Sequence, residues 1–372
     1  MSSTDSRQLQ YDPERMVKPA VRSMGAYQRQ PAPDTIPPRT LRLDWNESPH
    51  GPSPKARAVL SDFDVFHRYP EFDAATLRSA LADYIGAEPD QMVIGAGLDD
   101  VLNTLAMLLI EPGDNVIISE PTFGVYRALF SGHGADVVNV PLSPTWQIDA
   151  SAVLDAIDER TKFIVICNPN NPTGNVFDPK DVERICAEAP CVVCIDEAYA
   201  EFAGLNHLPL MRRYPNVAVM RTMSKFAGLA GMRVGYGAFP TSIVDYAMQV
   251  MPGFGNVSTA ATAVVLASLD DLPYLQSITA KIIHDREALA VQLRQIPGVE
   301  PMPSSTNFML VKLPLADAGP VNAELARRGV FVRHFGRPDL HLQEYLRVSI
   351  GTQEENSIFA EELAAILQGM GA

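Results

Sequence analysis

Short apolar runs rich in β-branched residues alternate with amphipathic segments between about residues 70 and 240. Strands are expected where these runs lie, at residues 91–95, 115–119, 135–140, 162–167 and 191–196. Helices are expected between them, over residues 74–86, 99–110, 124–132, 151–158 and 180–189. Such alternation is typical of an α/β fold, a mostly parallel sheet with helices on both faces. NVAVMRT at 216–222 and RVGYGAF at 233–239 extend the predicted sheet.

The pattern changes after residue 240 and indicates a smaller α+β domain. A long helix is expected over 272–296, strands at 306–313, 330–335 and 345–350, and helices at 318–329 and from Glu354. Residues 1–40 are polar, carry six prolines and lack periodicity, which predicts an extended arm. We therefore expect an arm at 1–40, a first part of the small domain at 41–67, a large domain at 68–272 and a small C-terminal domain at 273–372.

Charge and composition argue against several classes of protein. The 372 residues include 30 Lys and Arg against 44 Asp and Glu, a net charge of −14 that disfavours nucleic acid as a partner. No apolar stretch reaches the roughly 18 residues of a membrane span, and the first 15 residues lack the apolar core of a secretory signal. We expect the four cysteines to be buried and reduced rather than metal-bound, as in a cytoplasmic protein.

Residues 221–239, RTMSKFAGLAGMRVGYGAF, combine a lysine with a turn rich in glycine and alanine. An interior lysine is costly unless it is used or paired, and Lys225 lies between a strand end and this turn. Thr222 and Ser224 flank it, and Arg233 follows eight residues later. Hydroxyls, a cation and a glycine-rich backbone are what a bound phosphate monoester needs, although a surface Ser-Lys turn is the ordinary structural alternative.

Other polar groups follow expected strands. The run NPNNPTG at 168–174 places amides at the edge where α/β sheets bind ligands, although Asn and Pro also form ordinary turns. Asp196 ends an apolar strand, where it is either a functional carboxylate or a helix N-cap, and Tyr199 follows it. The run VIGAGLDDVL at 93–102 offers a helix N-terminus to a phosphate, but it lacks the third glycine of a dinucleotide fingerprint.

The motifs together resemble those of fold-type I pyridoxal-phosphate enzymes, the aspartate-aminotransferase-like superfamily. They are, in order, RYP, GAGLDD, PTFGVY, NPNNPTG, DEAY, TMSK with its later arginine, and LRVSIGT. Within that superfamily the chain most resembles histidinol-phosphate aminotransferases, from LDWNESPHGPSP at 43–54 to YLRVSIGT at 345–352. The resemblance implies a three-layer α/β/α fold, a large domain that binds pyridoxal 5′-phosphate, and a homodimer with shared active sites.

The resemblance also implies roles for individual residues. Lys225 would form a Schiff base with the cofactor and later move a proton as base and acid. Asp196 would pair with the pyridine nitrogen, so that the ring acts as an electron sink. The phenolic oxygen would accept hydrogen bonds from Asn171 and Tyr199, and Phe123 would stack on the ring. The phosphate would bind the amides of Leu98 and Asp99, the side chains of Thr222, Ser224 and Arg233, and Tyr69 from a second subunit.

On the substrate side, Arg347 in LRVSIGT resembles the arginine that binds a substrate carboxylate as a bidentate pair. Arg333 resembles a second arginine that holds a substrate phosphate, with an exposed strand charge as the alternative. Tyr27 and Asn46 are expected to close the pocket from the N-terminal side. The chain departs from the common family pattern by having leucine rather than serine at position 98, and phenylalanine rather than tyrosine at position 123.

The implied reaction transfers the amino group of L-histidinol phosphate to 2-oxoglutarate, giving imidazole-acetol phosphate and L-glutamate in histidine biosynthesis. An aromatic amino-acid aminotransferase and a phosphoamino-acid decarboxylase on the same scaffold remain open. A cofactor-binding regulator would need a basic DNA-binding module, and only about forty poorly patterned residues precede the first motif. A nicotinamide dehydrogenase would leave Lys225 unexplained.

Overall fold

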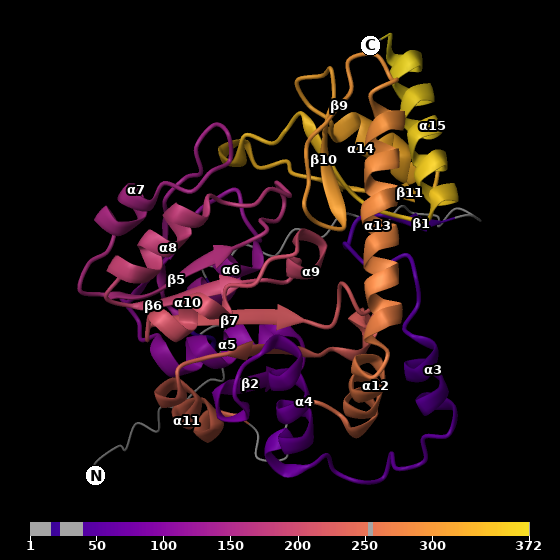
Figure 1. Ribbon diagram of the computed structural model, residues 1–372. Helices are drawn as coiled ribbons and strands as arrows, with labels where there is room; N and C mark the ends of the chain where they lie inside the picture. Colours follow the sequence, from indigo (N-terminus) through magenta and orange to yellow (C-terminus); the bar gives the residue numbers. More distant parts are fainter. Residues whose placement is uncertain (1–15, 23–39, 252–255, 372) are drawn as a thin grey trace, which may run out of the picture.

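A computed structural model describes residues 16–22, 40–251 and 256–371 of the chain (Figure 1). Its large sheet has seven strands: β2 Met92–Gly95, β3 Asn115–Ile118, β4 Asp136–Asn139, β5 Thr161–Cys167, β6 Val192–Asp196, β7 Val217–Thr222 and β8 Gly235–Ala238. Their order is β2-β8-β7-β6-β5-β3-β4. Strand β8 pairs antiparallel with β2 and β7, whereas the other neighbours pair parallel. The predicted mostly parallel sheet is confirmed.

Successive side chains of the central strands enter two cores on opposite faces of the sheet. Phe163 and Val165 pack with α5 (Leu98–Leu109), α6 (Val125–His133) and α11 (Thr241–Val250). Ile164 and Ile166 pack with α7 (Ala150–Asp155), α8 (Pro179–Glu188) and α10 (Leu208–Arg213). Because strand side chains alternate between faces, a sheet covered on both faces needs apolar residues at nearly every position. This arrangement is the predicted three-layer α/β/α fold.

A second group of elements surrounds a small antiparallel sheet. This sheet contains β9 (Glu300–Pro301), β10 (Phe308–Lys312), β12 (Arg333–His334) and β13 (Tyr345–Ser349), in the order β12-β13-β10-β9. Nearby, β1 (Leu41–Arg42) pairs parallel with β11 (Val330–Phe331). The long helix α13 (Leu272–Leu293) extends from the region of the large sheet to α14 (Gly319–Arg327) and α15 (Gln353–Met370) (Figure 1). Thus β1 joins the C-terminal elements despite its early place in the chain.

The remaining helices are α2 (Pro19–Arg22), α3 (Pro54–Ser61), α4 (Ala75–Ile85), α9 (Ala200–Ala203) and α12 (Thr259–Leu269), with short 3₁₀ segments at Phe72–Ala74, Pro89–Gln91, Ala230–Met232 and Pro338–Leu340. Within the described residues, no helix has both the length and the apolar character needed to cross a membrane. The proposed domain boundaries remain predictions.

Two expectations about local structure were wrong. The strand expected at 330–335 is two strands in different sheets, because β11 pairs with β1 whereas β12 pairs with β13. The expected arm includes the helix α2, which starts at Pro19, since proline presets a helical φ and needs no hydrogen-bond acceptor in the first turn. Most of residues 1–40 lie outside the described part of the chain.

Candidate active site

Three neighbouring parallel strands end at one edge of the large sheet and carry the predicted residues there. Strand β5 leads into the NPNNPTG run, β6 ends at Asp196, and β7 ends at Thr222, three residues before Lys225. The register aligns these ends, because Cys167 is opposite Asp196, which is opposite Met220. Parallel α/β sheets bind ligands at this carboxyl edge.

Lys225 is half-buried at the edge of the sheet, and its Nζ donates a hydrogen bond to the Trp45 carbonyl oxygen at 3.0 Å. Burial lowers the pKa of Lys225 to about 8, and the Arg347 cation acts in the same direction. A lowered pKa increases the share of uncharged amine near neutral pH, and the uncharged amine is the nucleophilic form. Lys225 therefore has the properties of a reactive lysine.

Asp196 is buried, and its carboxylate is held by two donors. The Ala198 amide donates to Oδ1 at 2.9 Å, and the Tyr126 hydroxyl donates to Oδ2. Burial raises the pKa of Asp196 to about 6 despite these two hydrogen bonds. Such a buried carboxylate is stabilised in its charged form by a cationic group brought against it.

Tyr126 is a site residue that sequence reasoning missed. It lies three positions after Phe123 in the PTFGVY motif, and its amide donates to the Phe123 carbonyl oxygen at 3.2 Å in the turn that begins α6. Their ring centroids are 5.4 Å apart in an edge-to-face arrangement. Tyr126 therefore connects the predicted stacking residue, Phe123, with Asp196.

Tyr199 is buried and receives two amide hydrogen bonds. The Nδ2 atoms of Asn46 and Asn171 donate to its hydroxyl oxygen at 3.0 and 3.3 Å. The Oδ1 atom of Asn171 accepts from Arg347 Nη1 at 2.7 Å, which fixes the orientation of that amide. These contacts bring together four predicted residues from distant parts of the chain, Asn46, Asn171, Tyr199 and Arg347.

Residues 44–46 contact the site mainly through their backbone. The Asp44 carbonyl oxygen accepts from Arg347 Nη2 at 2.6 Å, and the Trp45 carbonyl oxygen accepts from Lys225. The segment is anchored at Asn46, whose carbonyl oxygen accepts from Asn307 Nδ2 at 2.9 Å. Sequence reasoning missed Asp44 and Trp45, since a contact through a carbonyl oxygen leaves no signal in the residue type.

The start of α5 packs tightly against β8 and Arg233. A Cβ atom added at Gly235 would lie 2.1 Å from the Leu98 nitrogen, and one added at Gly97, whose φ is 93°, would lie 2.3 Å from Arg233 Nη2. Thr222 is directly opposite Gly235 in the sheet. The first amides of a helix lack intrahelical acceptors, so this point combines free donors, a guanidinium and a hydroxyl.

Several other predicted phosphate-binding groups lie around this point. Arg233 Nη2 is 3.9 Å from the Asp99 carboxylate, in the first turn of α5. The Ser224 amide donates to Thr222 Oγ1 at 3.1 Å, and both side chains are buried. A helix N-terminus, a cation and two hydroxyls form a suitable site for a phosphate monoester.

Arg333 and Arg347 are opposite each other in the β12–β13 pair. The guanidinium carbon of Arg347 lies 5.3 Å from the ring centroid of Phe308 and 5.9 Å from that of Phe335. Arg333 lies 5.8 Å from the Phe335 ring. Two cations flanked by aromatic rings are suited to an anionic substrate with an apolar or aromatic part.

Two predicted residues are not placed at this site. Tyr69 is 79 % exposed, between α3 and the 3₁₀ segment at Phe72. Tyr27 lies outside the described residues.

Comparison with known proteins defines the class of this protein. The aminotransferase class I and II family matches residues 38–363, and the chain belongs to this family. The histidinol-phosphate aminotransferase of Roseiflexus castenholzii is 37 % identical, covering 88 % of this chain and 90 % of the relative. That of Dehalococcoides mccartyi is 35 % identical, covering 93 % and 96 %. The crystal structure of histidinol-phosphate aminotransferase from Sinorhizobium meliloti, in complex with pyridoxal 5′-phosphate, is 26 % identical with a TM-score of 0.84, covering 95 % of this chain and 97 % of that one. The predicted superfamily and aminotransferase class are confirmed.

Proposed function

We propose that this aminotransferase uses pyridoxal 5′-phosphate to transfer the amino group of L-histidinol phosphate to 2-oxoglutarate. The products are imidazole-acetol phosphate and L-glutamate, a step of histidine biosynthesis. The observation that carries the proposal is that Arg333 lies opposite Arg347, whose cation in turn acts on the reactive Lys225. Relatives named for this activity, 35–37 % identical over about nine tenths of the chain, support the choice of donor.

The side chains at the site fit this cofactor. The start of α5, with Arg233, Thr222 and Ser224, provides donors for the phosphate, and buried Asp196 would hold the pyridine nitrogen in its protonated form. Asn171 and Tyr199 would hydrogen-bond the phenolic oxygen, and Phe123 would pack on the ring. When bound, the cofactor supplies an electron sink for charge that develops on the substrate carbon.

Lys225, Asp196 and Tyr199 are the proposed catalytic residues, and Lys225 is the one that would react directly. Its amine would bind the cofactor covalently in the resting enzyme. After displacement by substrate, the same amine would carry a proton between the substrate Cα and the C4′ atom of the cofactor. A pKa of about 8 suits both directions of transfer near neutral pH. Backbone contact with Trp45 would restrain the amine between these steps.

The arginine pair would serve both substrates in turn. Arg347 would bind a carboxylate of 2-oxoglutarate through a bidentate pair, and Arg333 would bind the phosphate of the donor. The two substrates occupy the site at different times, so one cationic pocket suffices. Asn46 and Tyr27 would close the pocket from the N-terminal side.

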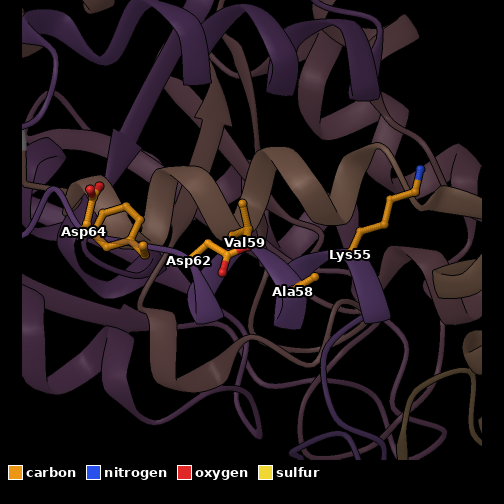
Figure 2. A pocket seen from close by; sticks show the side chains of 6 residues that line it. Lys55, Ala58, Val59, Asp62 and Asp64 are labelled. Carbon is orange, nitrogen blue, oxygen red and sulfur yellow. The ribbon is translucent and has the colours of Figure 1, made fainter.

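A homodimer is part of the proposal. Large apolar side chains are exposed on and after α3, and they include Leu60, Val65, Phe66, Tyr69 and Phe72. Beside them lies a groove of about 520 Å³ along α3, with Lys55 and Asp64 at its two ends (Figure 2). Extended apolar patches are uncommon on monomers, and a second copy would cover this one and receive Tyr69 at its phosphate site.

The described cysteines are free, and burial raises the pKa of the Cys167, Cys186 and Cys194 thiols. Unpaired thiols are typical of a reducing compartment, and we place the enzyme in the cytoplasm.

The test is a visible absorption spectrum of the purified protein before and after addition of L-histidinol phosphate without any keto acid. The proposal requires a coloured protein that bleaches with this donor and regains its colour with 2-oxoglutarate. If L-histidinol phosphate leaves the absorption spectrum unchanged but phenylalanine bleaches it, the assignment would move to an aromatic aminotransferase. A protein that cannot be reconstituted with pyridoxal 5′-phosphate would overturn the proposal.

A further inference from the structure

We infer that Glu197, Arg221 and His207 form a buried polar support that positions Asp196 and Lys225 from behind the active site. We call these three residues the buried support. They are positioning residues for the proposed reaction, and the inference therefore rests on the proposed function.

The carboxylate of Glu197 is fully buried and uses both oxygens. Its Oε1 accepts from the His207 amide at 2.6 Å and lies 2.7 Å from His207 Nδ1. Its Oε2 accepts from Arg221 Nε at 2.7 Å. A buried carboxylate in this position is held in one orientation by donors from two different segments.

Two members of the buried support, Glu197 and Arg221, lie at the ends of neighbouring strands. Arg221 belongs to β7, and strand alternation places it on the opposite face from Thr222, which leads to Lys225. Glu197 follows Asp196 directly, and its amide donates to the Met220 carbonyl oxygen at 2.7 Å. The Glu197–Arg221 contact thus ties the residue after Asp196 to the strand that leads to Lys225.

The third strand is joined through Asn168, which follows β5. Its amide donates to the Asp196 carbonyl oxygen at 2.9 Å, and its Nδ2 lies 3.4 Å from His207 Nε2. Asn168 is three residues before Asn171, which contacts Tyr199. The buried support therefore connects the ends of β5, β6 and β7, the three strands whose ends form the site.

A second connection leads to the residue beside Lys225. Arg221 Nη1 lies 3.8 Å from Glu201 Oε1, which accepts from the Tyr84 hydroxyl at 3.2 Å. The Tyr84 ring stacks on that of Phe226, with centroids 5.6 Å apart and an angle of 6° between the rings. Movement of Arg221 would thus be transmitted to Phe226, the residue that follows the reactive lysine.

The charges of Glu197 and Arg221 also indicate a role beyond stabilising the fold. The charge of Glu197 acts on Asp196 in the direction that protonates it. Arg221 offsets that charge, so its removal would leave an uncompensated carboxylate beside Asp196. A cation buried only for stability would have no such effect on the reaction.

The test compares Arg221→Met, the double variant Glu197→Gln/Arg221→Met and the control Lys281→Met in the full-length protein. Lys281 pairs with the buried carboxylate of Asp285 on α13, so the control removes a cation from a similar partner outside the site. The readouts are kcat, KM for L-histidinol phosphate, the melting temperature, and the Kd for pyridoxal 5′-phosphate from a fluorescence titration.

For Arg221→Met we expect kcat to fall about 10- to 100-fold, KM to change less than about threefold, and the cofactor Kd to rise about tenfold. The double variant should recover kcat by about fivefold or more, because it removes the uncompensated charge. Lys281→Met should lower the melting temperature with less than about a twofold change in kcat.

Equal losses of kcat in Arg221→Met and Lys281→Met at a similar melting temperature would overturn the inference. A double variant whose kcat is no higher than that of Arg221→Met would also overturn it. If Arg221→Met does not fold, the near-isosteric Glu197→Gln decides alone, since a positioning role requires a fall in kcat at unchanged KM. Failure of the wild-type protein to bind the cofactor or turn over L-histidinol phosphate would instead refute the proposed function.

Discussion

Arg333 of β12 is directly opposite Arg347 of β13 in the antiparallel sheet. Side chains opposite each other in such a pair start about 4.5–5.5 Å apart, and like charges there repel. Arg347 is also oriented by Asn171 and by the Asp44 carbonyl oxygen. An anionic group bound between the two guanidinium groups would relieve their repulsion, which supports the proposal that the pair binds a phosphate or carboxylate.

Replacement of Arg333 should therefore affect donors that carry a phosphate. We expect Arg333→Gln to raise KM for L-histidinol phosphate about tenfold or more, because one charge-assisted pair with the phosphate is lost. KM for phenylalanine, which carries no phosphate, should change much less. Steady-state kinetics with both donors measures the difference. Arg328→Gln is the control, because Arg328 is paired with Glu324 and Glu362 on the surface. Equal effects on both donors would contradict a phosphate-binding role.

Removal of the reactive amine should abolish turnover without preventing cofactor binding. Lys225→Ala is expected to lose activity by several orders of magnitude, because covalent catalysis and proton transfer both depend on this amine. Dialysis after loading should remove pyridoxal 5′-phosphate from the variant, since only non-covalent contacts remain. Lys162→Ala, which alters a lysine that pairs with Asp114 at the opposite end of β5 from the site, should behave like the wild type. Substantial activity in Lys225→Ala would refute the proposed mechanism.

The raised pKa of Asp196 makes the stability of the cofactor-free protein depend on pH. Because the folded protein holds this proton up to about pH 6 and the unfolded chain only up to about 3.8, ionisation of the buried carboxylate destabilises the fold as pH rises. The variant Asp196→Asn has no ionisable group at this position and therefore avoids this destabilisation. Between pH 5 and pH 7 the free energy of unfolding should shift by about 1 kcal/mol in favour of the variant, measured by urea denaturation. If the free energies of unfolding of the wild type and the variant changed equally between pH 5 and pH 7, this result would contradict the raised pKa of Asp196.

A methyl group at Gly235 should displace the start of α5. The added Cβ would lie 2.1 Å from the Leu98 nitrogen, and a helix backbone cannot yield as a flexible side chain does. Gly235→Ala is expected to destabilise the protein by about 2 kcal/mol or more and to weaken binding of pyridoxal 5′-phosphate about tenfold. Gly231→Ala is the matched control, because no atom lies within 4 Å of its added Cβ. Thermal unfolding and a cofactor titration measure both effects, and similar results for the two variants would disprove the tight packing.

Local sequence patterns were sufficient for the large sheet and for most of the proposed site. The apolar runs at β5 and β6 are visible because both faces of these strands are covered, and Asp196 stands out because it ends such a run. Lys225, Asn171 and Tyr199 lie in motifs whose order alone indicates the superfamily. These features are encoded within about ten residues, so they can be recognised without knowing which segments meet.

Only the tertiary structure decided how distant segments complete the site. The strand expected at 330–335 divides because β1 and β13 each pair with one part of it, and this division places Arg333 opposite Arg347. Trp45 reaches Lys225 through a carbonyl oxygen, and Arg221 meets Glu197 across two strands. Such contacts depend on long-range pairing and on backbone atoms that all residues share. Residue order therefore determined the class of enzyme and its candidate chemistry, whereas packing determined which groups face one another.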